Sequence, residues 1–161
     1  MSGDAEDFRW MNAALEQAER ALAAGEVPVG AAVVRNGELL SAGHNLTHTL
    51  QDPSAHAEML AIREAARSLG HWRLLDCILY ATLEPCAMCA GAIVLSRVPR
   101  LVFGAADPKA GMCGSLEDLV RNPRLNHRVA VRSGVLAAES AALLRDFFRA
   151  RRRVDRPEKE P

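Results

Sequence analysis

The most restrictive feature of the sequence is a pair of cysteines placed directly after a strand-like run. Residues 77–83 are apolar and β-branched, as is typical of a buried strand. Glu84 and Pro85 end this run, and we expect a helix to open at Cys86. A chain with 8 prolines and 4 cysteines in 161 residues gives about 0.005 Pro-Cys-x-x-Cys matches by chance. The segment therefore indicates a strand whose end presents two thiols.

Further helices are predicted by apolar residues that recur every three or four positions. One helix is expected over about residues 5–24, and another from near His56 to Gly70. A closing helix is expected over 137 to about 153. Residues 45–55, with their asparagine, aspartate, proline and serine, are typical of a loop.

Four further strands are expected. Residues 29–34 and 38–43 flank an Asn-Gly turn, which is the strongest short signal for a β-hairpin. Residues 101–104 and 129–131 form the last two strands. The chain between them, with a short helical patch at 116–120, is long enough for the crossover that parallel strands require. The pattern predicts an α/β domain with a mixed sheet of about five strands and helices on both faces.

Composition places these elements in one globular domain. A hydrophobic fraction of 49% with 25% charged residues is globular, and 161 residues suit a single domain. We expect that domain to span residues 1–154, followed by a polar tail at 155–161. The 20 basic and 20 acidic side chains cancel, which excludes a polycation that coats nucleic acids or membranes indiscriminately. Any contact with nucleic acid must come from a local patch.

The cysteine content and the N-terminus favour a cytoplasmic protein with no membrane partner. Four unevenly spaced cysteines are too few for a small secreted disulfide scaffold. The acidic first residues lack the apolar run of a signal peptide. No window approaches the roughly 18 to 20 apolar residues that a membrane span needs.

Two helix starts carry residue types that bind zinc. Cys86 and Cys89 are three residues apart and face the same way, and the helix dipole favours their thiolate forms. With His56 they make three protein ligands, the number typical of catalytic zinc, which keeps a fourth position for water. A structural site needs a fourth ligand, for which Cys77 and Cys113 are the candidates, although neither has the spacing of a zinc knuckle.

Glu58 supplies the carboxylate that a hydrolytic metal site needs to take up and pass on a proton. Spacing alone does not make it a partner of His56, because residues two apart on an ideal helix lie about 200° from each other. About 0.4 His-x-Glu matches are also expected by chance in this composition. The specific signal is therefore the cysteine motif and its combination with His-x-Glu.

With His56-Ala57-Glu58 and Pro85-Cys86-Ala87-Met88-Cys89, the chain resembles the bacterial tRNA-specific adenosine deaminases of the cytidine deaminase-like superfamily. The resemblance runs from about Met11 to Arg153. Its other segments are Val27-Pro28-Val29-Gly30, Asn45, Thr82-Leu83-Glu84, Cys89-Ala90-Gly91-Ala92, Phe103-Gly104-Ala105, Asp107, Lys109, Asn126-His127 and Asp146-Phe147-Phe148-Arg149. These outer segments separate the family from deaminases of small nucleosides.

The resemblance implies a three-layer α-β-α cytidine deaminase-like fold and a zinc mechanism. One Zn²⁺ per subunit would be held by His56, Cys86 and Cys89, and Glu58 would shuttle protons without being a ligand. Zinc-bound hydroxide would attack C6 of adenine, giving inosine and ammonia at the wobble position of a tRNA anticodon. Asn45 would contact the flipped nucleoside, since a side-chain amide both donates and accepts hydrogen bonds. Its alternative role is to cap the loop.

The basic stretch 145–153 predicts contacts to RNA, because arginines pair with phosphates while an aromatic side chain stacks on an unpaired base. The alternative is a solvated helix with a phenylalanine in the core. The residues expected to touch substrate, besides Asn45, are Phe148, Arg149 and Arg152 on this helix and, by the resemblance, Asp107, Lys109 and His44.

Several points stay open at this stage. Ala106 and His44 depart from the side chains of some relatives, which affects the recognition of neighbouring bases rather than the reaction. The same zinc motif would serve a deaminase of another free base or nucleoside, of the cytidine or guanine type. A protein of another class would use the metal only to fold an RNA-binding module. The family is homodimeric, and the small residues of Ala90-Gly91-Ala92 suit either a dimer interface or an internal contact.

Overall fold

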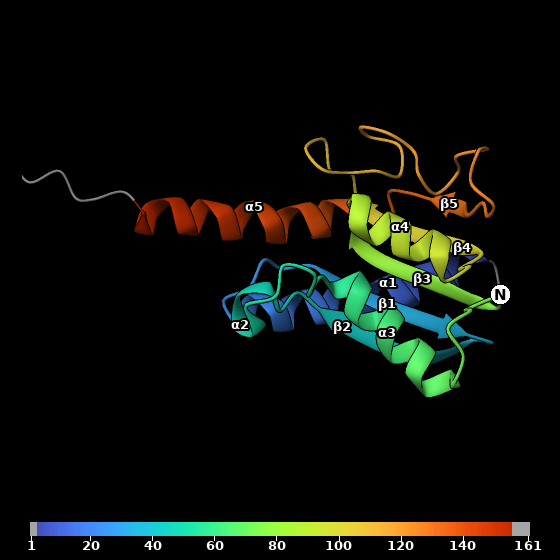
Figure 1. The fold of residues 1–161 in the computed structure, drawn as a ribbon. Helices are drawn as coiled ribbons and strands as arrows, with labels where there is room; N and C mark the ends of the chain where they lie inside the picture. Colours follow the sequence, from blue (N-terminus) through green and yellow to red (C-terminus); the bar gives the residue numbers. More distant parts are fainter. Residues whose placement is uncertain (1–2, 156–161) are drawn as a thin grey trace, which may run out of the picture.

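The predicted mixed sheet of five strands is present, with helices on both faces (Figure 1). The structure is a computed structural model that describes residues 3–155. In chain order its elements are α1 (Gly3–Ala23), β1 (Gly30–Arg35), β2 (Glu38–His44), α2 (Thr47–Leu50), α3 (Ala57–Leu69), β3 (Cys77–Leu83), α4 (Ala87–Leu95), β4 (Arg100–Ala105), β5 (Ala130–Arg132) and α5 (Ala137–Val154). The α/β class is confirmed, and the predicted strands and long helices agree to within two residues at each boundary. Beyond residue 155, the predicted polar tail lies outside the described residues.

The sheet has the strand order β2-β1-β3-β4-β5. Strand β1 is antiparallel to β2 and β3, whereas β3, β4 and β5 run parallel. The hairpin between β1 and β2 turns at Asn36 and Gly37, whose φ angles of 51° and 72° are the positive values that a type I′ turn requires. The expected crossover is also present, because residues 106–129 connect the parallel neighbours β4 and β5.

Alternate strand residues pack against opposite helical layers, as the two-residue period of a strand dictates. Val33 of β1 belongs to the core formed with α3 and α4. Its neighbour Val34 packs instead with Trp10 of α1. Helix α1 lies so close to β1 that a Cβ atom on Gly30 would come within 1.9 Å of the backbone oxygen of Ala14. Only a glycine fits at this contact.

Helix α1 is also tied to the sheet by a buried carboxylate. Asp7 is 1% exposed and accepts hydrogen bonds from Arg100, Arg132 and the Tyr80 hydroxyl, at 2.6 to 2.9 Å. Burial alone would raise the pKa of Asp7, but these hydrogen bonds outweigh it and lower the pKa to about 2. The three partners belong to β3, β4 and β5, so one side chain of α1 holds three strands.

The loop predicted over residues 45–55 contains a short helix, α2, that the sequence pattern did not reveal. Four residues are too few to show an apolar period. The helix is stabilised by Glu26, a residue far from it in the sequence. The buried carboxylate of Glu26 accepts hydrogen bonds from the backbone N–H groups of His48 and Thr49. A contact between residues more than twenty positions apart leaves no local signal.

The helical patch predicted at residues 116–120 is wrong. The segment forms turns, and its backbone N–H groups return to the preceding chain: that of Leu116 donates to Gly111, and that of Leu119 to Met112. Of the apolar residues there, Val120 is fully buried in the core beside α3 and α4, whereas Leu116 is exposed. None of the helices within residues 3–155 is long and apolar enough to cross a membrane.

The carboxyl ends of β3 and β4 and the first turns of α3 and α4 meet at one edge of the sheet (Figure 1). Strand β3 leads through Glu84 and Pro85 into α4, and β4 leads into the segment 106–129. Ligands of α/β proteins bind beyond the carboxyl ends of parallel strands. The residues singled out by the cysteine and histidine motifs lie at this edge.

Candidate metal centre and substrate pocket

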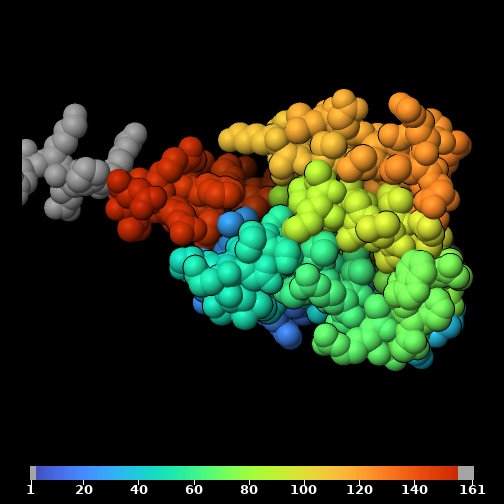
Figure 2. All heavy atoms as spheres, in the orientation of Figure 1, coloured from blue at the N-terminus to red at the C-terminus, as the bar shows by residue number. Residues whose placement is uncertain are grey.

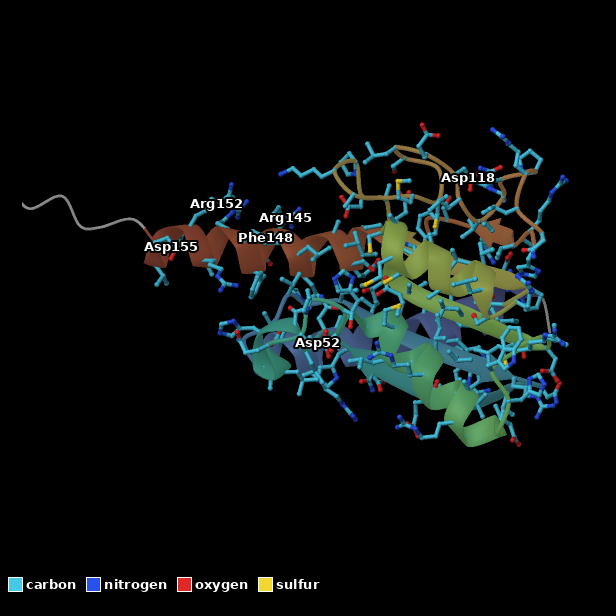
Figure 3. The ribbon with its side chains drawn as sticks, viewed as in Figure 1. Asp52, Asp118, Arg145, Phe148, Arg152 and Asp155 are labelled. Carbon is cyan, nitrogen blue, oxygen red and sulfur yellow. The ribbon has the colours of Figure 1, made fainter. Side chains whose placement is uncertain are left out.

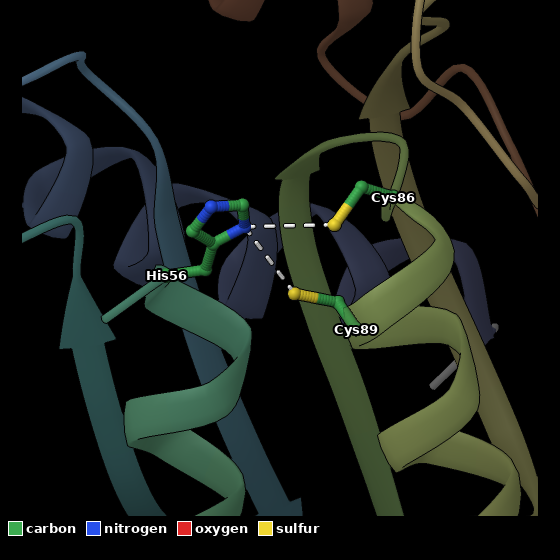
Figure 4. A group of neighbouring side chains, drawn as sticks. All are labelled: His56, Cys86 and Cys89. Carbon is green, nitrogen blue, oxygen red and sulfur yellow. Dashed lines mark hydrogen bonds between the residues drawn. The ribbon is translucent and has the colours of Figure 1, made fainter. Parts of the chain in front are cut away.

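Three side chains that can ligate a metal converge where α3 and α4 begin (Figure 4). The Nδ1 atom of His56 lies 3.6 Å from Sγ of Cys86 and 3.5 Å from Sγ of Cys89. The candidate ligand atoms of all three residues lie within 4.8 Å of one another. Cys89 is buried, whereas His56 and Cys86 are half-buried on the side that opens to a pocket.

These separations fit a zinc ion. A tetrahedral ion with a Zn–N distance of about 2.1 Å and a Zn–S distance of about 2.3 Å keeps its nitrogen and sulfur ligands about 3.6 Å apart. The two N–S distances observed are 3.6 and 3.5 Å. One imidazole with two thiols is also a donor set that zinc prefers. Neither Cys77 nor Cys113 joins the group, so within residues 3–155 the cluster has three protein ligands.

The backbone explains why residues from two helix starts reach one point. His56 and Cys86 are both N-cap residues with extended backbones, at φ −76° and ψ 151° for the first and φ −75° and ψ 179° for the second. Each therefore precedes its helix rather than lying on it. Cys89 lies in the first turn of α4, where its side chain points back toward the N-terminus.

The same observation removes the difficulty posed by the spacing of His56 and Glu58. Since α3 begins at Ala57, the angle of about 200° expected on an ideal helix does not apply to an N-cap residue. Glu58 lies in the first helical turn, is 4% exposed, and its Oε2 lies 3.6 Å from Sγ of Cys89. Burial raises the pKa of the Glu58 carboxyl above that of an exposed glutamate.

The electrostatics of the cluster favour a thiolate. Hydrogen bonds with Cys89 and His56 lower the pKa of the Cys86 thiol to about 3. The hydrogen bond to Cys86 in turn raises the pKa of His56, and the hydrogen bond to Cys86 together with burial raises that of Cys89. The hydrogen bonds of the cluster therefore favour the thiolate form of Cys86, which is the form of cysteine that binds metal.

The two polar atoms of the Asn45 side chain have different surroundings. Its Oδ1 accepts a hydrogen bond of 2.9 Å from the backbone N–H of Ala57, so it caps the first turn of α3. Its Nδ2 bonds to no acceptor within residues 3–155, and Asn45 lines the pocket. The alternative loop-capping role and a contact to substrate are thus compatible, because different atoms serve them.

The cluster lies in a cavity of about 860 Å³, in the size range of ligand-binding sites. Asn45, His56, Glu58 and Cys86 are all part of its lining. The segment 106–110 after β4 forms one wall, and Val27, Val29 and Thr47 contribute to another. In the space-filling view, α5 (red) runs out from the body between the segment after β4 (orange) and the region of α2 (teal) (Figure 2).

One face of α5 completes the pocket. Its lining residues recur at three- and four-residue intervals, namely Ala141, Leu144, Arg145, Phe148, Arg151, Arg152 and Asp155. The helix projects beyond the body of the protein, and only Ser140 among its residues is buried (Figure 3). Phe148 is 46% exposed, whereas Phe147 is half-buried and packs edge-on against it. Neither phenylalanine is therefore fully buried in the core, and Phe148 is the more exposed of the two.

The other predicted substrate contacts divide into two groups. Asp107, Lys109, Phe148 and Arg152 line the pocket with Asn45. His44 and Arg149 lie outside the lining that residues 3–155 provide. The Nδ1 atom of His44 lies 3.2 Å from Oε1 of Gln17 on α1, and Arg149 is exposed on α5.

Arg145, from the basic stretch predicted to contact RNA, also lines the pocket. Leu144 was not predicted but could have been, because it precedes Phe148 by four residues and so shares its helical face. Thr47 could not, since it belongs to the unpredicted helix α2.

The chain is similar in sequence to proteins of one kind. A family model described as MafB19-like deaminase matches residues 5–152. A tRNA-specific adenosine deaminase of Bacillus subtilis (strain 168) is 51% identical over 148 residues, which cover 92% of each chain. A tRNA-specific adenosine deaminase of Haemophilus influenzae is 47% identical over 154 residues, which cover 95% of this chain and 89% of that one.

Solved structures give the same picture of the fold. A structure from a study of A-to-I editing by tRNA:A34 deaminases at the wobble position of transfer RNA has a TM-score of 0.82 and 43% identity, covering 84% of this chain and 99% of that one. A structure from a study of guanine deaminase from Nitrosomonas europaea has a TM-score of 0.76 and 29% identity, covering 87% and 83%. The three-layer arrangement is thus shared with deaminases of more than one substrate.

Proposed function

This chain belongs to the family of the tRNA-specific adenosine deaminases, and from that membership we propose that it hydrolyses adenosine to inosine at the wobble position of a tRNA anticodon. The observation that carries the proposal is the His56, Cys86 and Cys89 cluster, with Glu58 beside it, inside a pocket that also has a basic helical wall. The reaction consumes water and releases ammonia, so the site must activate water and move protons. We take residues 1–154 to act as one catalytic domain.

His56, Cys86 and Cys89 are proposed to hold one zinc ion per chain. When bound, zinc supplies Lewis acidity, which makes water nucleophilic at neutral pH. The three residues fix the ion at the sheet edge, because two of them are N-caps and the third lies in the first turn of α4. Three protein ligands leave one tetrahedral position open, as catalytic zinc requires.

Glu58 is proposed to move the protons. Its carboxylate is 4% exposed and next to Cys89, so it exchanges protons inside the pocket rather than with bulk solvent. The carboxylate oxygens take one proton from water and deliver it to the adenine ring. They then take the second proton of that water, from the hydroxyl group now on C6, and deliver it to the amine, which leaves as ammonia. Burial favours the protonated carboxyl and so suits a group that must hold the proton between these transfers.

Asn45 and the α5 face are proposed to hold the substrate. The Nδ2 atom of Asn45 is available to donate to the flipped nucleoside while Oδ1 remains bonded to Ala57. Phe148 presents an aromatic surface on which a neighbouring base can stack, and Arg152 can pair with phosphate. Asp107 and Lys109 line the same cavity from the segment that follows β4. We propose smaller roles for His44 and Arg149, which lie outside the lining.

A second candidate substrate is a free base such as guanine, because the structure from the study of a guanine deaminase is 29% identical to this chain. Two observations favour the tRNA substrate. Relatives named for it share 44 to 51% identity with this chain. The pocket also has a cationic helical wall, which a free base does not require.

Because the proposed substrate is tRNA, we propose that the protein acts in the cytoplasm.

We also propose that the protein is a homodimer. Ala90 is fully buried, so it serves an internal contact. A Cβ atom on Gly91 would meet no atom within 4 Å, which leaves this part of α4 available to a second copy. Light scattering at micromolar concentration tests the dimer, and a monomer would contradict it.

The decisive assay offers the zinc-loaded protein an anticodon stem-loop with a wobble adenosine, and separately free adenosine, cytidine and guanine. We expect ammonia and inosine from the stem-loop alone. Turnover of a free base or nucleoside instead would keep the zinc chemistry and overturn the tRNA assignment. Tight binding of RNA without turnover would identify a non-catalytic module.

A further inference from the structure

Glu84 is a buried carboxylate at the edge of the pocket that has no role in the chemistry proposed above. It follows the last residue of β3 and is 2% exposed. Its oxygens accept from the backbone N–H groups of Asp107, Cys113 and Ser115, at 3.0 to 3.1 Å, and from the Ser115 hydroxyl. All four donors belong to one segment, residues 107–115, which enters the crossover between β4 and β5.

Hydrogen bonds alone compensate the charge of Glu84. Among residues 3–155, none of the ion pairs includes it. The chain wraps it tightly, because a Cβ atom on Gly111 would lie 2.4 Å from the Glu84 carboxyl. A buried carboxylate held by several N–H donors specifies the path of the chain that supplies them.

The segment that Glu84 holds is a wall of the pocket. Asp107, Lys109 and their neighbours between 106 and 110 line the cavity but are mostly exposed, so packing in the core does not fix their positions. The Oδ1 atom of Asp107 accepts from the N–H groups of Lys109 and Ala110, which folds this part into a turn. The turn is therefore anchored through the hydrogen bond from the Asp107 N–H to Glu84.

The far side of the segment also donates to Glu84, through Cys113 and Ser115, but it has further contacts. Cys113 and Val120 are buried in the core, and the backbone N–H of Met112 donates to the oxygen of Pro85. Loss of the Glu84 carboxylate would leave these contacts in place and release mainly the part nearest the pocket. The expected defect is thus one of position, not of folding.

We propose that Glu84 is a positioning residue for substrate recognition, which holds the 107–110 wall in the place where it meets the RNA that flanks the target adenosine. The inference rests on the proposed function, since it assigns the wall to RNA. Two residues that follow β3 would then have different roles. Cys86 would bind the metal, and Glu84, two residues earlier, would hold the 107–110 wall in position.

The test compares Glu84→Gln with a matched buried carboxylate away from the pocket. Glutamine keeps the size of the side chain but turns an amide NH₂ toward donors, which breaks part of the network. Asp7→Asn is the control, because Asp7 is equally buried, is surrounded by donors and anchors the other face of the sheet. Zinc content, thermal midpoint, kcat and KM for the stem-loop are measured for both variants and the unsubstituted protein. RNA affinity is measured by fluorescence anisotropy in the Glu58→Gln background.

We expect Glu84→Gln to keep its zinc, to raise KM and to weaken RNA affinity about tenfold, with a smaller change in kcat. Asp7→Asn should lower the thermal midpoint at least as much as Glu84→Gln does, but should leave KM unchanged. An unchanged KM and RNA affinity in Glu84→Gln, or an equal loss in Asp7→Asn, would overturn the proposal. The unsubstituted protein reports separately on the proposed function, which fails if that protein neither binds nor deaminates the stem-loop.

A second variant covers the case in which Glu84→Gln does not fold. Ser115→Ala removes one donor to Glu84 and leaves every backbone hydrogen bond in place. It should raise KM in the same direction by about threefold, without loss of zinc. A folded Ser115→Ala protein with unchanged KM and RNA affinity would count against the role of Glu84.

Discussion

The Nδ1 atom of His56 lies 3.6 Å from the Sγ atom of Cys86, although 30 positions separate the two residues in the sequence. Each is the residue immediately before a helix, and the two helices begin at the same edge of the sheet. Strand β2, which precedes α3 in the chain, and strand β3, which precedes α4, run in the same direction, because both are antiparallel to β1 between them. The contact is therefore a product of sheet topology, which places the starts of α3 and α4 at the same end of the sheet.

Replacing Glu58 with glutamine should abolish turnover and spare binding. The amide cannot accept and return a proton, and general acid–base groups contribute typically about 10²- to 10⁴-fold to rate. Zinc content and RNA affinity should stay close to those of the unsubstituted protein, because Glu58 is not a metal ligand. Inosine formation and metal content are measured on the same preparation, and residual activity above about a tenth would contradict the proton-shuttle role.

The roles of the oxygen atom and the nitrogen atom of the Asn45 amide can be tested separately. Asn45→Asp keeps an acceptor for the Ala57 N–H but removes the Nδ2 donor. We expect helix α3 and the thermal midpoint to be retained, and kcat/KM for the stem-loop to fall by about tenfold or more. Asn45→Ala removes the cap as well and should also lower the midpoint. Equal kcat/KM in Asn45→Asp and the unsubstituted protein would show that the amide nitrogen does not contact substrate.

Two neighbouring arginines on α5 form a natural pair for testing the RNA-binding face. Arg152 lines the pocket, whereas Arg149 lies outside the lining. Arg152→Ala should weaken stem-loop binding by about tenfold and reduce the salt dependence of affinity by about one unit of slope. Arg149→Ala should have a smaller effect. The reverse order, measured by anisotropy between low and moderate salt, would place RNA on a different face of the helix.

Stability in acid should depend on Asp7. Its pKa is about 2 in the folded protein and 3.8 as a reference, so the ionised form contributes about 2 kcal/mol of stability above pH 4. Because the folded value is the lower one, this contribution is lost as the pH falls from about 4 toward 2. Asp7→Asn should be less stable by about 3 kcal/mol at pH 7 and should lack this acid-dependent part.

Urea unfolding between pH 7 and pH 2 measures the effect. Glu64→Gln is the control, since the Glu64 side chain is 55% exposed and should change stability little. If the stability difference between the unsubstituted protein and Asp7→Asn is the same at pH 2 as at pH 7, the assignment of the buried ion pairs to acid stability is wrong.

The parts of the fold that could be predicted are those with a local cause. The strand at Cys77–Leu83, the Asn36-Gly37 hairpin and the periodic helices each follow from neighbouring residues, and each is present. The cluster of His56, Cys86 and Cys89 could be predicted because all three residues lie at helix starts. The partnership of His56 and Glu58 could not, since it depends on which residue is the N-cap, and helix boundaries are resolved only to within a residue or two.

The features that could not be predicted are held by contacts between distant residues. Helix α2 exists because Glu26 accepts its N–H groups, and the segment 107–115 follows Glu84 rather than a helical pattern. A glutamate in a sequence looks the same whether it is solvated or buried among donors. Only the three-dimensional position of the donors distinguishes the two.

The projecting helix α5 has an evolutionary consequence. The turns of α5 that follow Ser140 line the pocket but contain no buried side chain. Substitutions in these turns therefore have little effect on folding. The proposed zinc ligands, in contrast, lie at the starts of helices that pack on the sheet. Natural variation can therefore alter which nucleic acids are accepted while the reacting centre is inherited unchanged, and divergence in substrate range should accumulate on this helix first.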